Sequence, residues 1–127
     1  MENMEEKTKR KILIIDDEEP DRKSLARILH KAGYRNVSCV ETGEEGIEIS
    51  KSFKPDIILI DVVLKKGIDG FDVCKQIKSL EGLKPIVIMI TGHLDAISAE
   101  KARHSGADEI VEKSLDFKRL LSTIGAS

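Results

Sequence analysis

Two adjacent carboxylates, Asp16 and Asp17, directly follow an apolar run over residues 12–15. A short apolar run without alternation is typical of a strand that is buried on both faces. A third carboxylate, Asp61, ends a second run of the same kind over residues 57–60. Carboxylates that lie close together repel one another unless a cation neutralises them, and oxygen ligands suit a hard divalent ion. The sequence therefore predicts that Asp16, Asp17 and Asp61 hold Mg²⁺.

A hydroxyl and an amine follow two further apolar runs. Thr91 comes after residues 85–90, and Lys113 comes after residues 108–112. A carboxylate can act as a nucleophile and form an aspartyl phosphate, and Asp61 suits this role because it stands alone at its strand end. Phosphoryl transfer also requires positive charge and hydrogen-bond donors around the phosphoryl oxygens. A metal ion, the amine of Lys113 and the hydroxyl of Thr91 would provide them.

Strands and helices that alternate five times are needed to bring these residues together. The predicted strands cover residues 11–15, 36–40, 56–61, 85–90 and 108–112, and a helical pattern follows each of them. This order is typical of an α/β fold with a parallel sheet and helices on both faces. In such a sheet the carboxyl ends of the strands lie along one edge, where ligands bind. The acids, the hydroxyl and the amine are therefore expected at a common edge.

Composition limits the classes of function. The 127 residues are enough for one domain, which we assign to residues 11–127, and the charged residues 1–10 are predicted to form a flexible tail. No apolar stretch is long enough to span a membrane. The net charge of -2 gives no general electrostatic reason to bind nucleic acid. Cys39 and Cys74 fit neither a disulfide framework nor a zinc site, so we expect a cytoplasmic protein.

The chain resembles the receiver domain of two-component response regulators over about residues 10–125. The resemblance rests on five short motifs, which are residues 14–18, residues 56–61, Gly70, residues 90–92 and residues 106–108 with Lys113. It implies a flavodoxin-like fold, a doubly wound three-layer sandwich with the parallel strand order 2-1-3-4-5. Both a stand-alone receiver and a domain of a longer regulator or hybrid kinase are consistent with it.

The resemblance also implies a function in phosphorelay signalling rather than in enzymatic catalysis. Asp61 would accept a phosphoryl group from a phosphohistidine on a sensor histidine kinase or a histidine phosphotransfer protein. The three acids would bind Mg²⁺ with the backbone carbonyl of Val63. Thr91 would move to bond the phosphoryl group, and Lys113 would pair with it. An interaction surface would pass the signal to a downstream protein or output domain. Within the domain over residues 11–127, this surface would be formed by the fourth helix, the last strand and the last helix.

Two positions depart from the receiver pattern. Receivers usually have an aromatic residue three positions before the lysine, where this chain has Ile110, and a proline after it, where this chain has Ser114. A cis bond before a residue other than proline costs roughly 3 kcal/mol, so we predict a trans bond at Ser114 and a reshaped loop. The loop from Asp61 to Gly70 is also one residue longer than is usual for receivers. We expect intact phosphorylation chemistry with a different read-out.

The residues of this chain also bear on three other functions. A hydrolase of the haloacid-dehalogenase kind needs an acid two residues after the nucleophile, and Val63 occupies that position. A flavin carrier needs a loop of backbone N–H donors after the first strand, and residues 16–19 are all acidic there. A receiver-like interaction module that is never phosphorylated remains an alternative, which Ile110 and Ser114 support.

Overall fold

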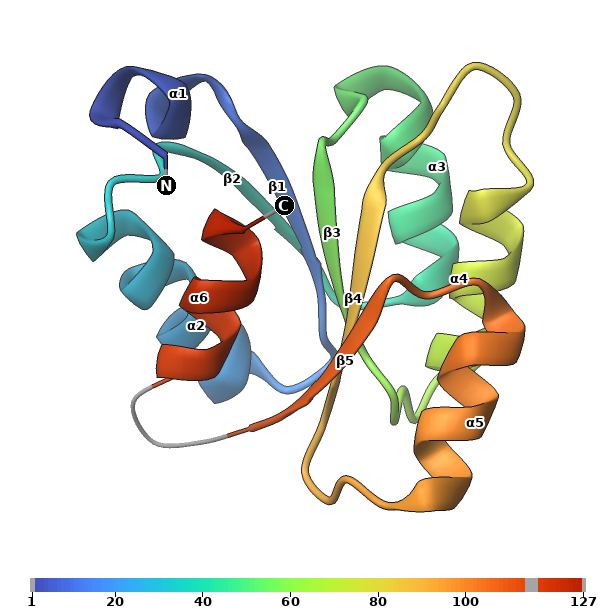
Figure 1. Cartoon of the computed structure of the whole chain (residues 1–127). Coiled ribbons are helices and arrows are strands. Elements are labelled where there is room, and N and C mark those ends of the chain that lie inside the picture. The colour runs from blue at the N-terminus through green and yellow to red at the C-terminus, as the bar shows by residue number, and fades with distance from the viewer. Residues whose placement is uncertain (1, 114–116, 127) are drawn as a thin grey trace.

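Five parallel strands form the centre of the molecule in the order β2-β1-β3-β4-β5, which confirms the predicted flavodoxin-like topology (Figure 1). The strands are β1 (Lys11–Ile15), β2 (Asn36–Val40), β3 (Ile57–Asp61), β4 (Ile86–Thr91) and β5 (Glu109–Glu112). The helices are α1 (Met4–Lys9), α2 (Glu19–Lys31), α3 (Gly43–Phe53), α4 (Gly70–Lys78), α5 (Ala96–Ser105) and α6 (Lys118–Gly125). This computed structural model describes residues 2–113 and 117–126.

Helices cover both faces of the sheet and divide the core into two halves. In Figure 1, α2 and α6 lie on one face, and α3, α4 and α5 lie on the other. Along β1, Ile12 and Ile14 pack with α2 and α6, whereas Leu13 and Ile15 pack towards the other three helices. All four side chains are fully buried, and each contributes about 2 kcal/mol of hydrophobic stabilisation. Burial on both faces explains why the strand runs lack alternation.

The register of the strands aligns their carboxyl ends. Ile15 of β1 pairs with Ile60 of β3, Asp61 pairs with Ile90 of β4, and Thr91 pairs with Glu112 of β5. Each of these neighbouring strands therefore ends within a residue or two of the same line. The polar residues that follow the strands are brought to a common edge, as the sequence predicted.

Side-chain hydrogen bonds cap the start of several helices. The side chain of Thr42 accepts a hydrogen bond from the backbone N–H of Glu45 at the start of α3. At the start of α5, Asp95 and Ser98 each bond the backbone N–H of the other. Such caps satisfy backbone donors that have no partner within the helix. Among the described residues, no helix has the length and apolar character needed to cross a membrane.

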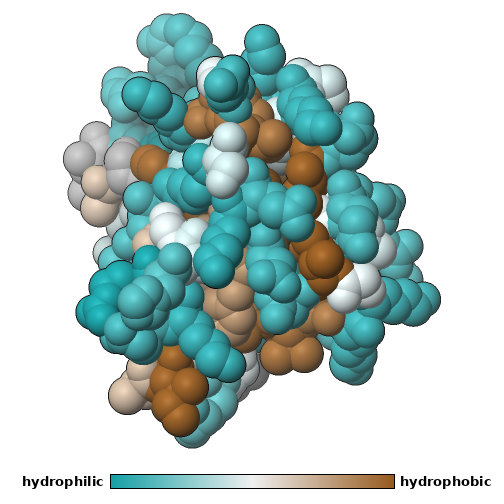
Figure 2. Space-filling view, turned by 90° about the vertical axis from the view of Figure 1, so that its right-hand side faces the viewer, coloured by the Kyte–Doolittle hydropathy of each residue, from teal (hydrophilic) through white to brown (hydrophobic). Residues whose placement is uncertain are grey.

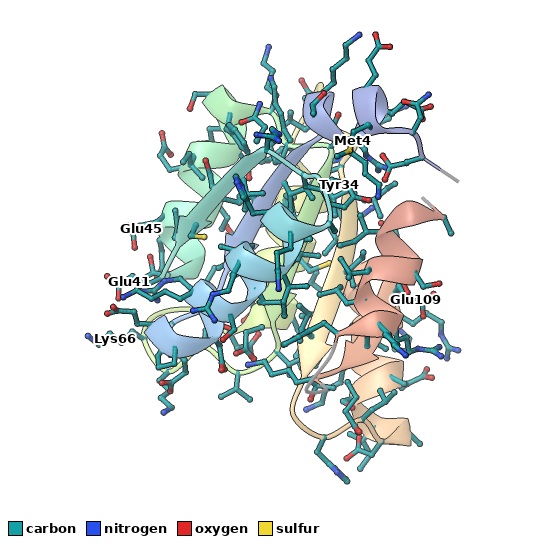
Figure 3. All side chains as sticks on the ribbon, turned by 90° about the vertical axis from the view of Figure 1, so that its left-hand side faces the viewer. Met4, Tyr34, Glu41, Glu45, Lys66 and Glu109 are labelled. Carbon is teal, nitrogen blue, oxygen red and sulfur yellow. The ribbon has the colours of Figure 1, made fainter. Side chains whose placement is uncertain are left out.

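Residues 4–9 correct the prediction of a flexible tail over residues 1–10, because they form the helix α1. A six-residue helix is unstable alone, so its stability depends on tertiary contacts. Met4 lies near Tyr34 in Figure 3, and a methyl group added at Gly33 would come within 2.8 Å of its Sδ. The amine of Lys7 donates to the backbone oxygen of Ala32 at 3.0 Å. The start of the chain is therefore packed against the amino end of the sheet.

A buried ionic cluster supports this packing. One carboxylate oxygen of Glu2 accepts a hydrogen bond from the Tyr34 hydroxyl, and the other lies 3.0 Å from Nη1 of Arg10. The side chain of Glu2 is only 6% exposed. Arg10 also donates to the backbone oxygen of Ile124 at 3.4 Å, which links the start of the chain to α6. Burial and the nearby Glu2 carboxylate raise the pKa of the Tyr34 hydroxyl above its ordinary value.

Candidate functional site

Two of the predicted acids and the predicted amine meet at the carboxyl edge of the sheet. The ammonium nitrogen of Lys113 lies 3.0 Å from Oδ2 of Asp61 and 3.4 Å from Oδ2 of Asp16. The side chains of Asp16 and Asp61 are only 2% and 8% exposed. These residues follow three different strands, β1, β3 and β5, so only the parallel sheet brings them together. A charge-assisted contact of this kind is consistent with the chemistry that the sequence predicted.

Hydrogen bonds orient both oxygens of the Asp61 carboxylate. Oδ1 accepts from the backbone N–H of Val63 at 3.0 Å, and Oδ2 accepts from the amine of Lys113. Gly70, at the start of α4, packs directly against this strand end. A Cβ atom at Gly70 would lie 2.3 Å from the backbone oxygen of Asp61, so any larger residue would push the loop away. Hydrogen bonds therefore fix the side chain of Asp61, and the packing of Gly70 fixes its backbone.

Asp17 has a carboxylate oxygen that lacks a partner. Its Oδ2 accepts from the backbone N–H of Lys65 at 2.7 Å. Its Oδ1 is buried and forms no hydrogen bond with any residue that the structure describes. A buried polar atom without a partner is rare, and a bound ion is one of the recognised reasons for it. This oxygen is available to a cation, but Asp17 lies outside the group of Asp16, Asp21 and Asp61, whose carboxylate oxygens lie within 4.8 Å of one another.

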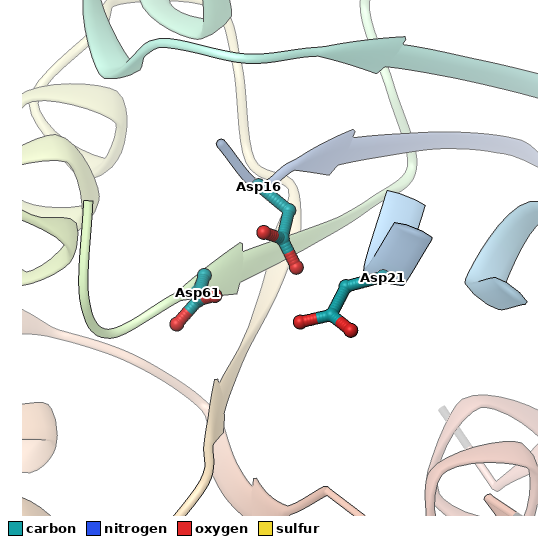
Figure 4. Close-up of side chains that lie close together, drawn as sticks. All are labelled: Asp16, Asp21 and Asp61. Carbon is teal, nitrogen blue, oxygen red and sulfur yellow. The ribbon is translucent and has the colours of Figure 1, made fainter. Parts of the chain in front are cut away.

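A fourth acid, Asp21, also faces this site and was not among the predicted site residues. Asp16, Asp21 and Asp61 each offer a carboxylate oxygen within 4.8 Å of the others (Figure 4). Asp21 makes the shortest contact of the three with the Lys113 amine, at 2.6 Å. In the sequence, Asp21 was only one of several acids near the start of a helix. The available signal was its place in the first turn of α2, the helix that follows the carboxyl end of β1.

The electrostatic surroundings of the site change the acidity of two groups. Burial raises the pKa of Asp16 to about 6, and the neighbouring Asp61 carboxylate acts in the same direction. A hydrogen bond from the backbone N–H of Glu18 partly offsets this rise. For Lys113, burial alone would lower the pKa, but its bonds to Asp21 and Asp61 raise it above the ordinary lysine value. The ammonium group is therefore charged at neutral pH.

Thr91 lies at the same edge, but its hydroxyl is bonded to the following loop. The hydroxyl donates to the backbone oxygen of His93 at 3.1 Å and accepts from the backbone N–H of His93 at 3.2 Å. The backbone N–H of Lys113 donates to the Thr91 backbone oxygen at 2.7 Å, so the two residues are neighbours across β4 and β5. The next loop residue, Leu94, donates its N–H to a carboxylate oxygen of Glu112 at 2.7 Å. The loop between β4 and α5 is thus tied to β5.

Of the two departures from the receiver pattern, only Ile110 lies among the described residues. Ile110 of β5 is partly buried and packs against the half of the core that α3, α4 and α5 cover. Ser114 lies outside the described residues, so the predicted trans bond there stays a prediction. Metal ligation by the backbone carbonyl of Val63 also stays a prediction. The contact that the structure shows for Val63 is the hydrogen bond from its N–H to Asp61.

Known proteins resemble this chain along most of its length. The model of the response regulator receiver domain family matches residues 12–125. The transcriptional regulatory protein AfsQ1 of Streptomyces coelicolor is 35% identical over 115 residues, which are 91% of this chain and 49% of that protein. This chain thus spans about half the length of that relative.

Solved structures agree with this match. A putative response regulator from Chloroflexus aurantiacus has a TM-score of 0.85 at 27% identity, covering 92% of this chain and 95% of that one. The N-terminal domain of a response regulator/sensory box/GGDEF 3-domain protein from Carboxydothermus hydrogenoformans has a TM-score of 0.80 at 34% identity, covering 92% of both chains. With this fold and the family match over residues 12–125, the chain belongs to the response regulator receiver domain family of two-component systems.

Proposed function

We propose that this receiver domain accepts a phosphoryl group on Asp61 and passes the signal on through an interaction surface. The observation that supports this proposal most strongly is the contact between the Asp61 carboxylate and the Lys113 ammonium, at 3.0 Å in a largely buried site. The ammonium can neutralise charge on an incoming phosphoryl group. A phosphoryl group held on Asp61 would take part in a phosphorelay and not in the turnover of a small-molecule substrate.

The donor that we propose is a phosphohistidine on a sensor histidine kinase or a histidine phosphotransfer protein. A carboxylate oxygen of Asp61 attacks the phosphorus atom, and an oxygen–phosphorus bond forms while the phosphorus–nitrogen bond to the donor imidazole breaks. The electron pair of the broken bond stays on the imidazole nitrogen. Since the reaction needs mainly positioning and charge neutralisation, the fixed orientation of the Asp61 oxygens supports this role.

We further propose that Asp16, Asp17 and Asp61 hold Mg²⁺, with the backbone carbonyl of Val63 as a further ligand. Two observations support this assignment. Oδ1 of Asp17 is buried without a partner among the described residues, and carboxylate oxygens of Asp16 and Asp61 lie within 4.8 Å of each other. When bound, Mg²⁺ supplies positive charge to the phosphoryl oxygens. The residues of this chain bind the ion, orient the Asp61 oxygens and keep the Lys113 ammonium beside them.

The read-out that we propose begins with Thr91. To bond a phosphoryl group, its hydroxyl has to leave the backbone of His93. The loop would then change its contact with Glu112 of β5, because Leu94 is bonded there. Ile110 has no hydroxyl to exchange between buried and exposed positions, so the loop itself carries the change.

The surface that would pass on the signal comprises α5, β5 and α6. Ile97 of α5 is 69% exposed, and Leu94 just before this helix is also exposed. Figure 2 shows the side of the molecule that includes α5, where hydrophobic residues lie among hydrophilic ones. We propose a protein or output domain as the downstream partner, without direct binding of nucleic acid or membrane by this domain. The free cysteines Cys39 and Cys74 are consistent with a reducing cytoplasm.

Acetyl phosphate with Mg²⁺ tests the phosphorylation chemistry. We expect the intact mass of the wild-type protein to rise by one phosphoryl group, and we expect no such adduct with Asp61→Asn. The Asp72→Asn variant is a matched control because it removes the charge of an exposed aspartate in α4 whose carboxylate bonds none of Asp16, Asp61 and Lys113. If neither acetyl phosphate nor a phosphorylated histidine kinase produced an adduct, the unphosphorylated interaction module would be the better assignment.

Beryllofluoride, which mimics a phosphoryl group, tests the read-out. With Mg²⁺ present, we expect the backbone amide signals of residues 91–94 and of β5 to shift in the ¹H–¹⁵N spectrum. Unchanged signals in β5 would contradict the proposed loop coupling without affecting the assignment of Asp61.

A further inference from the structure

The ammonium group of Lys113 has three carboxylate partners, and one of them lies outside the receiver motifs. Its nitrogen is 2.6 Å from Asp21, 3.0 Å from Asp61 and 3.4 Å from Asp16. An ammonium group has three N–H donors, so these three contacts use its full capacity. Asp21 makes the shortest of these contacts, although the proposed phosphorelay chemistry gives this residue no role.

The start of α2 fixes the position of Asp21. Pro20 begins the helix with a restricted backbone, and Asp21 follows in the first turn. Nη1 of the next residue, Arg22, donates to the backbone oxygen of Asp16 at 2.7 Å, which ties the helix to the end of β1. The Asp21 side chain thus approaches Lys113 from a helix, whereas the other two acids approach from strand ends. It is 43% exposed, so it can hold a charge at a lower desolvation cost than the two buried acids.

The two buried acids have a second task that Asp21 does not share. We assigned Asp16 and Asp61 to the cation, so their oxygens have to serve the metal as well as the ammonium. A carboxylate oxygen of Asp61 also forms the new bond to phosphorus. An oxygen of Asp21 also lies within 4.8 Å of oxygens of Asp16 and Asp61, but its 2.6 Å bond to Lys113 is the shortest of the three contacts. In the ligand set proposed above, Asp21 is therefore the carboxylate that is left to the ammonium.

We propose that Asp21 is a positioning residue that holds the Lys113 ammonium beside the Asp61 carboxylate. This proposal rests on the proposed function for its catalytic consequence, but the positioning itself is a property of the metal-free protein. Residues that orient a charged group in a site commonly contribute about 10- to 100-fold to activity or metal affinity. Asp21 acts through Lys113 and need not contact the phosphoryl group.

The first experiment measures the order of the ammonium group without metal or phosphodonor. In ¹⁵N-labelled protein, the Lys113 ammonium signal is identified by its absence in Lys113→Arg, and its proton exchange with water is measured. We expect slow exchange in the wild type and at least about tenfold faster exchange in Asp21→Asn. Glu19→Gln is the matched control, because Glu19 carries the same charge in the same helical turn but pairs with Lys23.

The second experiment measures phosphorylation by acetyl phosphate at saturating Mg²⁺. We expect Asp21→Asn to lower the maximal rate by about tenfold, with little change in the half-saturating concentration of the donor. Glu19→Gln is expected to match the wild type, and Asp21→Glu, which restores the charge, to recover part of the rate. A rate that falls equally in both charge-removing variants would overturn the proposal, because general electrostatics would then explain it.

The two experiments separate the possible failures. If the wild type takes up no phosphoryl group, the proposed function is wrong, while ammonium exchange still decides whether Asp21 positions Lys113. If the wild-type ammonium exchanges rapidly, or Asp21→Asn leaves its exchange unchanged, the positioning role is wrong whatever the phosphorylation result.

Discussion

The two ends of the sheet both bury charged side chains, but they balance these charges differently. At the amino end, the two carboxylate oxygens of Glu2 are each bonded, one to Tyr34 and the other to Arg10. At the carboxyl end, a single ammonium group from Lys113 faces the carboxylates of Asp16, Asp21 and Asp61. Asp17 adds another carboxylate there, with an oxygen that lacks a partner among the described residues.

This difference indicates which end contributes to folding and which end is kept available for a ligand. A buried carboxylate with complete hydrogen bonding keeps its charge at little cost, and its loss leaves its partners unsatisfied. Unneutralised carboxylates lower the stability of the metal-free fold, because like charges repel at short distance. Neutralising a charge should therefore have opposite effects on stability at the two ends.

Asp17→Asn is expected to have the largest effect. Loss of a charged ligand should weaken Mg²⁺ binding by at least about 100-fold, as measured by isothermal titration calorimetry. The same substitution should raise the free energy of unfolding of the metal-free protein, by roughly 1 kcal/mol, because it removes a negative charge from an end of the sheet where carboxylates outnumber the Lys113 ammonium.

Glu2→Gln is the matched control at the amino end. It should leave the Mg²⁺ dissociation constant unchanged and should lower the free energy of unfolding, because Arg10 loses its charged partner. The contrast between the two ends is wrong if both substitutions change stability in the same direction.

The next largest effect is the pH dependence that Asp16 confers on stability. Its pKa is about 6 in the folded protein and 3.8 as an ordinary carboxyl, so the folded state binds more protons between these values. The stability of the metal-free protein should therefore fall as the pH rises from about 4 to about 6, by roughly 3 kcal/mol, and level off above that range. Urea unfolding of wild type and Asp16→Asn across this range isolates the contribution.

The control for this prediction is the difference in the free energy of unfolding between the wild type and Asp16→Asn. Asp16→Asn lacks the titrating group, so the difference in stability between the proteins should change with pH in the stated window. A difference that is constant from pH 4 to pH 7 would mean that Asp16 is not the group responsible. Saturating Mg²⁺ should suppress the loss of stability in the wild type, because the ion binds the deprotonated carboxylate.

Tyr34→Phe tests the amino end with a smaller change. It removes only the hydroxyl that donates to Glu2, and a buried hydrogen bond to a charged group contributes about 1.5 to 3 kcal/mol. Thermal or urea unfolding should show a loss within this range, with unchanged Mg²⁺ binding. Glu5→Gln on α1 breaks only an exposed pair with Lys9 and should leave stability unchanged.

The smallest expected effect concerns the loop beside the carboxyl end. Glu112→Ala removes the acceptor of the Leu94 N–H, so the amide signals of residues 92–95 should shift. The free energy of unfolding should change by less than about 1 kcal/mol, because the contact is exposed. A larger loss would indicate that this loop contributes to folding as the amino end does.

Several features of the fold could be read directly from residue types. Isoleucine-rich runs that lack alternation have to be buried on both faces, and the described strands β1 and β3 bear this out. Because every parallel strand points the same way, the polar residues after each run reach one edge. This is why Asp61 and Lys113, which are 52 residues apart, could be predicted to meet.

The sequence by itself therefore determined the sheet, its helices and the meeting of Asp16, Asp61 and Lys113, because periodicity and strand direction are local properties that extend to the whole fold. Only the tertiary structure decided that Asp21, and not Glu19 in the same helical turn, reaches the ammonium. It also decided that residues 4–9 form a helix, since so short a segment is stable only against the rest of the protein. Both outcomes depend on side-chain direction and contacts between distant segments, which charge and propensity along the chain do not encode.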